Sequence, residues 1–331
     1  MAVKSLSLTL LALFLSFPAL AQEAVFPIAC NPGVSCYILS YPDLDKAEGS
    51  ARDYACGPAA NDGDGTLRIG LADLQSLRQG IDVLATRPGK VIDAKDGIED
   101  LVATSKSDLK RGTPNCGNGI VIDHGGGLQS AYCHLRKDSI RVKKGDHVQA
   151  GDTIGQVGQS GVAFWPQLGF SMQSSGLFVD PISSMSDLEG CGWKQRPMIP
   201  LPDVFKEYQG ATVVSMGFSP APITTKALKL GLGVHSPVMD REQMDMNLWA
   251  MILGVRTGDR IEVRLRDPRG RTFEYRDITA NADETQTPIN VSRTRGYASW
   301  RQGTYTGEIT LTRKVEWRDV KTTKRVQMVI Q

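Results

Sequence analysis

The sequence predicts an all-β protein, with an antiparallel β-sheet core domain followed by a C-terminal β-sandwich-like domain. Three observations support this fold class. Short apolar runs with an alternating pattern recur along the chain, and turns rich in Gly, Asp and Pro separate them. One short helical leucine pattern lies at residues 71–80 and ends at Gly80. A proline-rich stretch between Cys191 and Pro202 marks a change of pattern and therefore a domain boundary.

The first 21 residues have the pattern of a cleavable secretory signal. Lys4 supplies a positive start, an apolar run follows, and small residues end the segment at Ala21. No later stretch of the sequence is apolar for long enough to span a membrane. We therefore expect residues 1–21 to be removed and the mature protein to be periplasmic or secreted.

Residues 22–60 are loop-rich and are expected to form a disulfide-stapled N-terminal arm. The chain contains six cysteines, and an even number in an exported protein favours disulfide bonds over a metal site. Cys30 and Cys36 flank a turn-like segment and are suited to closing a small loop. The sequence does not select among the other pairings, which involve Cys56, Cys116, Cys133 and Cys191.

Strand patterns dominate residues 61–192, which we assign to the β-sheet core domain. Residues 80–94 alternate around a Pro-Gly turn, and residues 119–124 and 128–135 form a hairpin pattern joined by glycines. Residues 139–158 continue with short strands between Gly-Asp turns. Residues 203–331 carry further short alternating segments, which predict the β-sandwich-like domain. These segments lie at 211–219, 248–255, 259–267, 271–280, 304–313 and 325–331.

Five short motifs carry a family resemblance. They read CGNGIVIDHGGG at 116–127, AYCHL at 131–135, KKGD at 143–146, QVGQSG at 156–161 and LFVDP at 177–181. In this order and spacing they resemble the lysostaphin/LytM-type metallopeptidase family (metallopeptidase family 23), whose members are zinc endopeptidases that cut peptide cross-links in bacterial cell walls. The resemblance covers roughly residues 56–185 and implies a LytM-type antiparallel β-sheet core.

The zinc-binding motifs of that family are degenerate in this chain. The family pattern supplies HxxxD, YxHL and HxH, and the YxHL element survives as Tyr132 to Leu135, which places His134 at a catalytic position. The HxH element reads Gln167, Leu168 and Gly169. An amide and a glycine do not replace two imidazoles, because zinc prefers histidine, cysteine and carboxylate ligands.

The HxxxD element allows two registers. We prefer the one in which it falls within Asp62–Arg68; the other places Asp82 at the family aspartate and Arg78 at the histidine. No histidine precedes His124 in the chain, so neither register supplies the first imidazole ligand.

We therefore predict an exported LytM-like peptidase homologue that is catalytically inactive and holds no metal or cofactor. In this interpretation His134 is a hydrogen-bonded remnant of the site. His124, Tyr132, Gln167 and Gly169 line a groove that binds peptidoglycan or a periplasmic cell-wall hydrolase.

Two alternatives stay open. One is an active zinc metalloendopeptidase with substituted ligands, including a rebuilt site that joins His124, His134 and a carboxylate. The other is a structural or assembly protein in which residues 203–331 make the main contacts. A net charge of only +2 and the absence of a basic stripe argue against a nucleic-acid partner.

Overall fold

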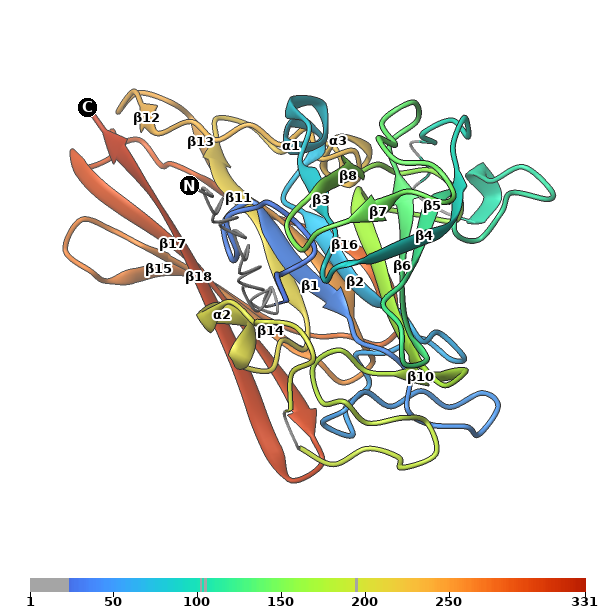
Figure 1. Ribbon diagram of the computed structural model, residues 1–331. Helices are drawn as coiled ribbons and strands as arrows, with labels where there is room; N and C mark the ends of the chain where they lie inside the picture. Colours follow the sequence, from blue (N-terminus) through green and yellow to red (C-terminus); the bar gives the residue numbers. More distant parts are fainter. Residues whose placement is uncertain (1–23, 102, 104–105, 194–195) are drawn as a thin grey trace, which may run out of the picture.

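In the described part of the chain, the regular secondary structure is almost all antiparallel β-sheet, which confirms the all-β fold class (Figure 1). The computed structural model describes residues 24–101, 103, 106–193 and 196–331. The expected signal segment 1–21 lies outside them. Among the described strand pairs, all are antiparallel except the short pair β12–β18. No helix in this part of the chain has the length and apolar character needed to cross a bilayer.

Most strands of the region that resembles the peptidase family belong to one eight-stranded sheet, which we call the large sheet. Its strand order is β1 (Cys36–Ser40), β2 (Leu67–Leu71), β9 (Gln167–Ser174), β6 (Leu128–Leu135), β5 (Asn118–Asp123), β4 (Gly89–Lys95) and β7 (His147–Val148), with β10 (Leu177–Val179) paired to β9. Strands β3 (Asp82–Leu84) and β8 (Thr153–Gln156) form a separate two-stranded sheet. The predicted hairpin at 119–124 and 128–135 is confirmed as β5 and β6.

Helix α1 (Leu74–Gln79) forms where the leucine pattern predicts it. The Asp73 side chain caps its start by accepting a hydrogen bond from the Ser76 amide at 2.7 Å. Gly80 ends it with a φ of 78°, a conformation that glycine adopts without steric cost. The other helical segments are the single turn η1 (Lys106–Asp108), α2 (Asp203–Lys206) and α3 (Thr225–Lys229).

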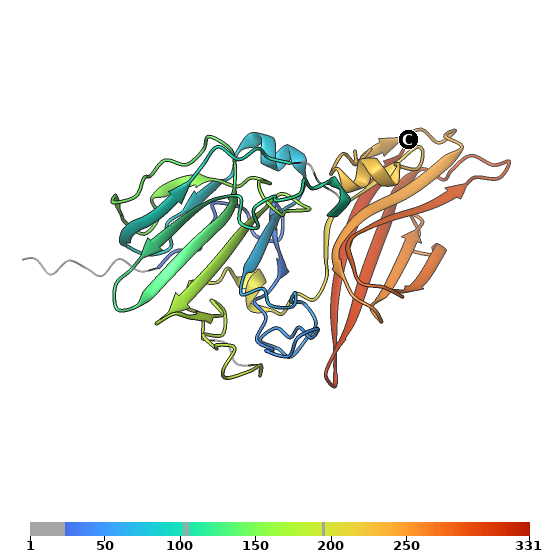
Figure 2. The same cartoon turned by 90° about the vertical axis from the view of Figure 1, so that its right-hand side faces the viewer.

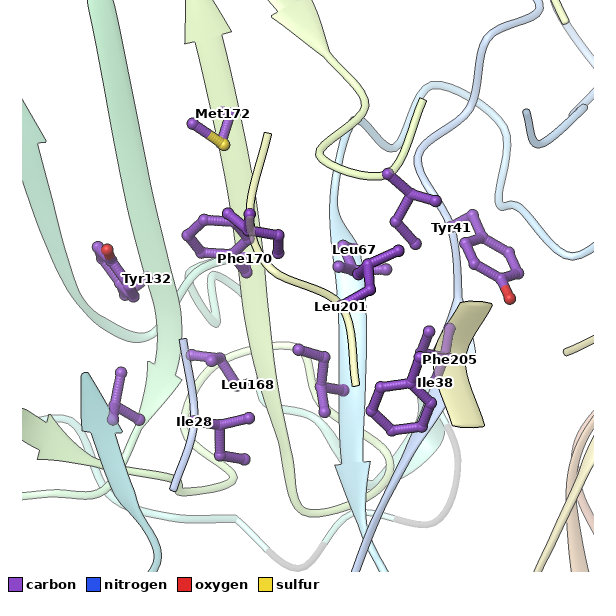
Figure 3. Close-up of a cluster of buried hydrophobic side chains, with 14 of the residues drawn as sticks. Ile28, Ile38, Tyr41, Leu67, Tyr132, Leu168, Phe170, Met172, Leu201 and Phe205 are labelled. Atoms are coloured by element: carbon purple, nitrogen blue, oxygen red, sulfur yellow. The ribbon is translucent and has the colours of Figure 1, made fainter. Parts of the chain in front are cut away.

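Strand β1 lies within the segment expected to be a loop-rich arm, and the sequence did not predict it. Cys36 and Ile38 face the core of the large sheet, whereas Tyr37 packs in a different hydrophobic cluster on the other face. Because both faces are covered, the strand has no polar alternation to reveal it. Figure 3 shows how Ile28, Leu201 and Phe205 cover the large sheet beside Leu168 and Phe170.

The C-terminal part forms two sheets packed face to face, here called the sandwich. One has the order β11 (Thr212–Ser219), β13 (Asp245–Val255) and β16 (Glu284–Thr294). The other has the order β12 (Val238–Met239), β18 (Arg318–Ile330), β17 (Gly303–Val315), β14 (Arg260–Arg266) and β15 (Thr272–Thr279). Leu248 and Ile252 from the first sheet and Val263 and Ile309 from the second share one core, in agreement with the predicted sandwich.

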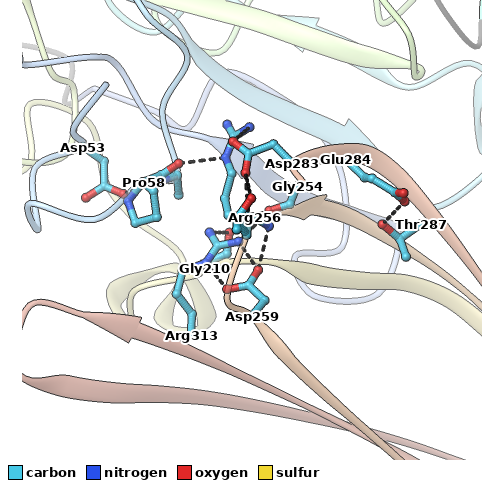
Figure 4. Close-up of polar contacts among 12 residues, drawn as sticks. Asp53, Pro58, Gly210, Gly254, Arg256, Asp259, Asp283, Glu284, Thr287 and Arg313 are labelled. Carbon is cyan, nitrogen blue, oxygen red and sulfur yellow. Dashed lines mark hydrogen bonds and ion pairs between the residues drawn. The ribbon is translucent and has the colours of Figure 1, made fainter. Parts of the chain in front are cut away.

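The sandwich packs directly against the large sheet (Figure 2). Strand β13 is buried on both faces, since Leu248 points into the sandwich core while Trp249 and Met251 pack with Tyr37 and Trp165. Close to this contact, Arg313 forms a buried ion pair with Asp259 (Figure 4).

All six cysteines are paired, which confirms the expected disulfide framework. Cys30 and Cys36 close the small loop that their spacing suggested. Cys56 pairs with Cys191, and Cys116 with Cys133. The Cys56–Cys191 bond ties the segment before β2 to the segment after β10.

Candidate functional site

The end of strand β6 carries His134, the residue predicted at the catalytic position. Tyr132, two residues earlier, faces the hydrophobic core and packs against Phe170 of β9, with ring centroids 5.3 Å apart. In a regular strand His134 would face the same way. Its φ of 63° turns the chain instead, and its ring lies over Gly169 on the opposite face of the sheet. A Cβ atom at position 169 would lie 3.0 Å from His134 Cδ2, so the glycine leaves the space that the imidazole occupies.

Both ring nitrogens of His134 have partners. Nδ1 lies 2.9 Å from the Ser160 carbonyl oxygen, and Nε2 lies 3.1 Å from Arg68 Nη1. A carbonyl oxygen only accepts hydrogen bonds, so Nδ1 carries the proton and Nε2 accepts a hydrogen bond from the guanidinium. The side chain is therefore held as one neutral tautomer.

Burial keeps His134 uncharged at neutral pH. The residue is only 2% exposed. Desolvation, followed by the positive charge of Arg68, lowers the pKa of His134 to about 4.

Arg68 of strand β2 reaches the same point from the neighbouring strand. It pairs in register with Gly169 of β9, which directs its side chain to the face where the His134 ring lies. Its Nε and Nη2 atoms both donate to Asp64 Oδ2, at 2.9 and 2.8 Å. The Arg68 and Asp64 side chains are only 23% and 18% exposed, respectively. A fixed guanidinium thus lies between a carboxylate and the imidazole.

The structure brings the Asp62–Arg68 stretch, and not Asp82, next to His134. Asp82 in β3 lies near Arg141, Thr153 and Gln156, at 3.5, 3.4 and 3.3 Å. The spatial arrangement therefore favours the first of the two registers for the degenerate HxxxD element.

Two of the four predicted groove residues, His124 and Tyr132, lie away from the His134 ring. The Tyr132 hydroxyl contacts Ser130 and Thr86, and Ser130 in turn contacts His124 Nε2 at 2.8 Å. His124 Nδ1 lies 2.9 Å from the Pro88 carbonyl oxygen, and burial lowers the pKa of His124. This network lies on the core-facing side of β6.

Gln167 and Gly169 belong to the opposite face of the large sheet, because Leu168 between them points into the core. Both are buried, and the Gln167 residue is 5% exposed. The four residues predicted to line one groove are therefore divided between the two faces of the sheet. The alternation of side chains along β6 and β9 is the physical reason.

The residues around His134 do not fit a zinc ion. Gln167 offers an amide, Gly169 offers no side chain, and Arg68 brings a cation that repels a metal. Among the described residues, no three His, Cys, Asp or Glu side chains converge as a metal-binding group. A rebuilt site with His124 is also disfavoured, because its contact Ser130 lies four residues from His134, or about 13 Å along a strand.

The contact between Arg68 and His134 was missed from the sequence. A charged residue inside the apolar run LRIGL is the one signal that pointed to it, since buried strand positions rarely hold arginine without a partner. The other partner of the ring, the Ser160 carbonyl, belongs to the backbone and has no signal in the residue pattern.

The buried imidazole leads to a pH-dependent prediction. An unfolded histidine titrates near pH 6.5, so between pH 6.5 and 4 the unfolded state binds a proton that the folded state excludes. His134 should therefore contribute about 3 kcal/mol to the free energy of unfolding above pH 6.5. This contribution is lost as the pH falls to 4. Chemical denaturation of the natural protein and of the His134→Asn variant across this pH range checks the prediction. Asparagine is chosen because it tolerates the positive φ at this position. Equal pH profiles for the two proteins would contradict it.

The profile of peptidase family M23 matches residues 73–181. This range includes His134, Gln167 and Gly169 and begins after Asp64 and Arg68. No curated protein matches the chain.

Several solved structures are similar. One is the SpoIIQ–SpoIIIAH pore-forming complex, with 15% identity over 50% of this chain and 93% of that chain and a TM-score of 0.34. Another is the catalytic domain of the prophage-encoded M23 protein EnpA from Enterococcus faecalis. It has 22% identity over 42% of this chain and 82% of that chain, and a TM-score of 0.28. A third is the catalytic domain of lysostaphin from Staphylococcus simulans. It has 20% identity over 46% of this chain and 83% of that chain, and a TM-score of 0.26.

Proposed function

Because residues 73–181 belong to peptidase family M23, a family of metallopeptidases, we propose that this protein is an exported, catalytically inactive M23 homologue that binds peptidoglycan. A single observation carries the inactivity in this proposal. The Arg68 guanidinium donates to His134 Nε2 and is held there by Asp64. The centre of the degenerate motif is thus filled by a positively charged side chain of the protein itself.

The chemistry of peptide hydrolysis supports inactivity. A zinc peptidase needs three protein ligands and a metal-bound water whose pKa is brought near neutrality. Here the His134 ring uses both nitrogens for internal hydrogen bonds, and Gln167 and Gly169 replace two imidazoles. A neutral imidazole whose pKa is about 4 is also a weak base at neutral pH.

Export and a cell-wall ligand are parts of the proposal with separate support. Three disulfide bonds are typical of proteins in oxidising compartments outside the cytoplasm. The first 21 residues have a signal pattern, and the family resemblance points to peptidoglycan or to a hydrolase that acts on it. Of these two partners we choose peptidoglycan, and make the hydrolase an outcome of the test.

Sedimentation with purified sacculi tests this function. The mature chain should sediment with sacculi and release no soluble muropeptides over hours, with or without added zinc. Chelator-sensitive release of muropeptides would instead establish the active zinc endopeptidase. If the protein stayed in solution yet raised the activity of a wall hydrolase, the partner would be the hydrolase and not the glycan.

A further inference from the structure

A cleft of about 660 Å³ lies where the sandwich meets the segments that cover the large sheet. We call it the hairpin cleft, because the far end of the long β17–β18 hairpin forms one wall. Its walls include Tyr54, Trp193, Lys206, Glu207, Tyr208 and Lys321. Figure 1 shows α2 beside β18, above the tip of that hairpin. The cleft is distinct from the His134 centre, and none of its walls comes from β6 or β9.

The walls of the hairpin cleft are held in place by packing. Val315, at the end of β17, is 1% exposed and belongs to the core of the large sheet. Tyr208 stacks on Tyr41 with ring centroids 5.4 Å apart, and its hydroxyl donates to Asp53 at 2.5 Å. Its volume lies within the range of small-ligand sites, and its packed walls form the cleft without a bound ligand.

One cation lies between two aromatic rings beside the cleft. The Arg318 guanidinium lies 4.7 Å from the Trp193 ring and 4.3 Å from the Trp317 ring, so it stands beside both indoles. Trp317 is 74% exposed at the hairpin tip. An exposed tryptophan next to a polar cleft is typical of a surface that binds a partner.

The charged groups of the cleft favour an anionic ligand. Lys206 forms an ion pair with Asp203, so the charges left at the cleft are those of Lys321 and Arg318 against Glu207, a net charge of +1.

We propose that the hairpin cleft binds a disaccharide-peptide unit of peptidoglycan. This rests on the proposed function and adds a second contact, remote from the M23 centre. The apolar face of a sugar ring packs on an exposed indole such as Trp317, as other amphipathic groups do on aromatic side chains. The peptide carboxylates meet Lys321 and Arg318, whose charges also speed the encounter.

Calorimetric titration of the mature protein with soluble disaccharide muropeptides tests the cleft. Trp317→Ala and Lys321→Glu change exposed side chains, so both variants should fold. Each should weaken binding by about tenfold or more. Tyr297→Ala and Lys144→Glu are matched controls, an exposed aromatic residue and an exposed lysine outside the cleft, and should bind like the natural protein. Muropeptides with amidated carboxylates should bind more weakly than the native fragments.

The outcomes separate the two proposals. If the natural protein sediments with sacculi while Trp317→Ala and Lys321→Glu bind muropeptides as tightly as it does, the cleft proposal is wrong and the proposed function stands. If the natural protein binds neither sacculi nor muropeptides, both are wrong. Equal affinity for amidated and native fragments would overturn the assignment of Lys321 and Arg318 to the peptide carboxylates.

Discussion

Replacing Cys56 and Cys191 by serine should lower the free energy of unfolding by about 5 kcal/mol. The two cysteines are 135 residues apart in sequence, and a cross-link that closes a long loop removes the most entropy from the unfolded chain. The bond also joins the segment before β2 to the segment after β10, so its loss should loosen one end of the large sheet.

Denaturant unfolding without reductant measures this effect. The matched control is the Cys30→Ser, Cys36→Ser variant, because that disulfide spans only 6 residues. Its loss should lower the free energy of unfolding by about 2 kcal/mol by the same reasoning. Equal losses for the two variants would show that loop length does not govern the contribution of these bonds.

Asp259→Ala should destabilise the protein by about 3–5 kcal/mol, because it leaves a buried guanidinium without its counter-charge. Arg313 and Asp259 side chains are 4% and 5% exposed, and Arg313 Nε donates to Asp259 Oδ1 at 2.8 Å. The same guanidinium donates to the carbonyl oxygens of Gly210 and Gly254, each at 2.7 Å (Figure 4). It thereby links β17, β13 and the chain just before β11.

Two variants make this result interpretable. Removing both charges with Asp259→Leu and Arg313→Met should cost less than Asp259→Ala alone, since no buried charge is left unpaired. Asp203→Ala breaks an ion pair with Lys206 in which the side chains are 95% and 60% exposed, and it should change stability little. A small loss for Asp259→Ala would contradict the assignment of Arg313 as a buried cation that needs its partner.

Local patterns were enough to predict several elements. The leucine spacing before Gly80 gave α1, and the apolar runs on either side of three glycines gave β5 and β6. These elements depend on residues close in sequence. Strand β1 was missed, because packing on both faces leaves no alternation in CYILS. Strand β13 shows the same effect as a continuous apolar run.

The candidate site was predicted only in part. The sequence showed that the family imidazoles are missing at Gln167 and Gly169, and it placed His134 in the remaining motif. It did not show that Arg68, 66 residues away in sequence, fills the centre. That contact depends on β2 lying beside β9, a long-range pairing that one sequence does not encode locally. The predicted groove also required Tyr132 and Gln167 to face the same side of the large sheet, and the alternation of side chains along β6 and β9 places them on opposite faces.

The central claim is that the Arg68 guanidinium and the loss of two imidazoles leave the degenerate motif around His134 without a zinc site. Elemental analysis of the purified mature protein, after equilibration with zinc and removal of free metal, tests it most directly. We predict far less than one zinc per chain, with no change when Asn replaces His134. One zinc per chain, lost in the His134→Asn variant, would contradict the claim.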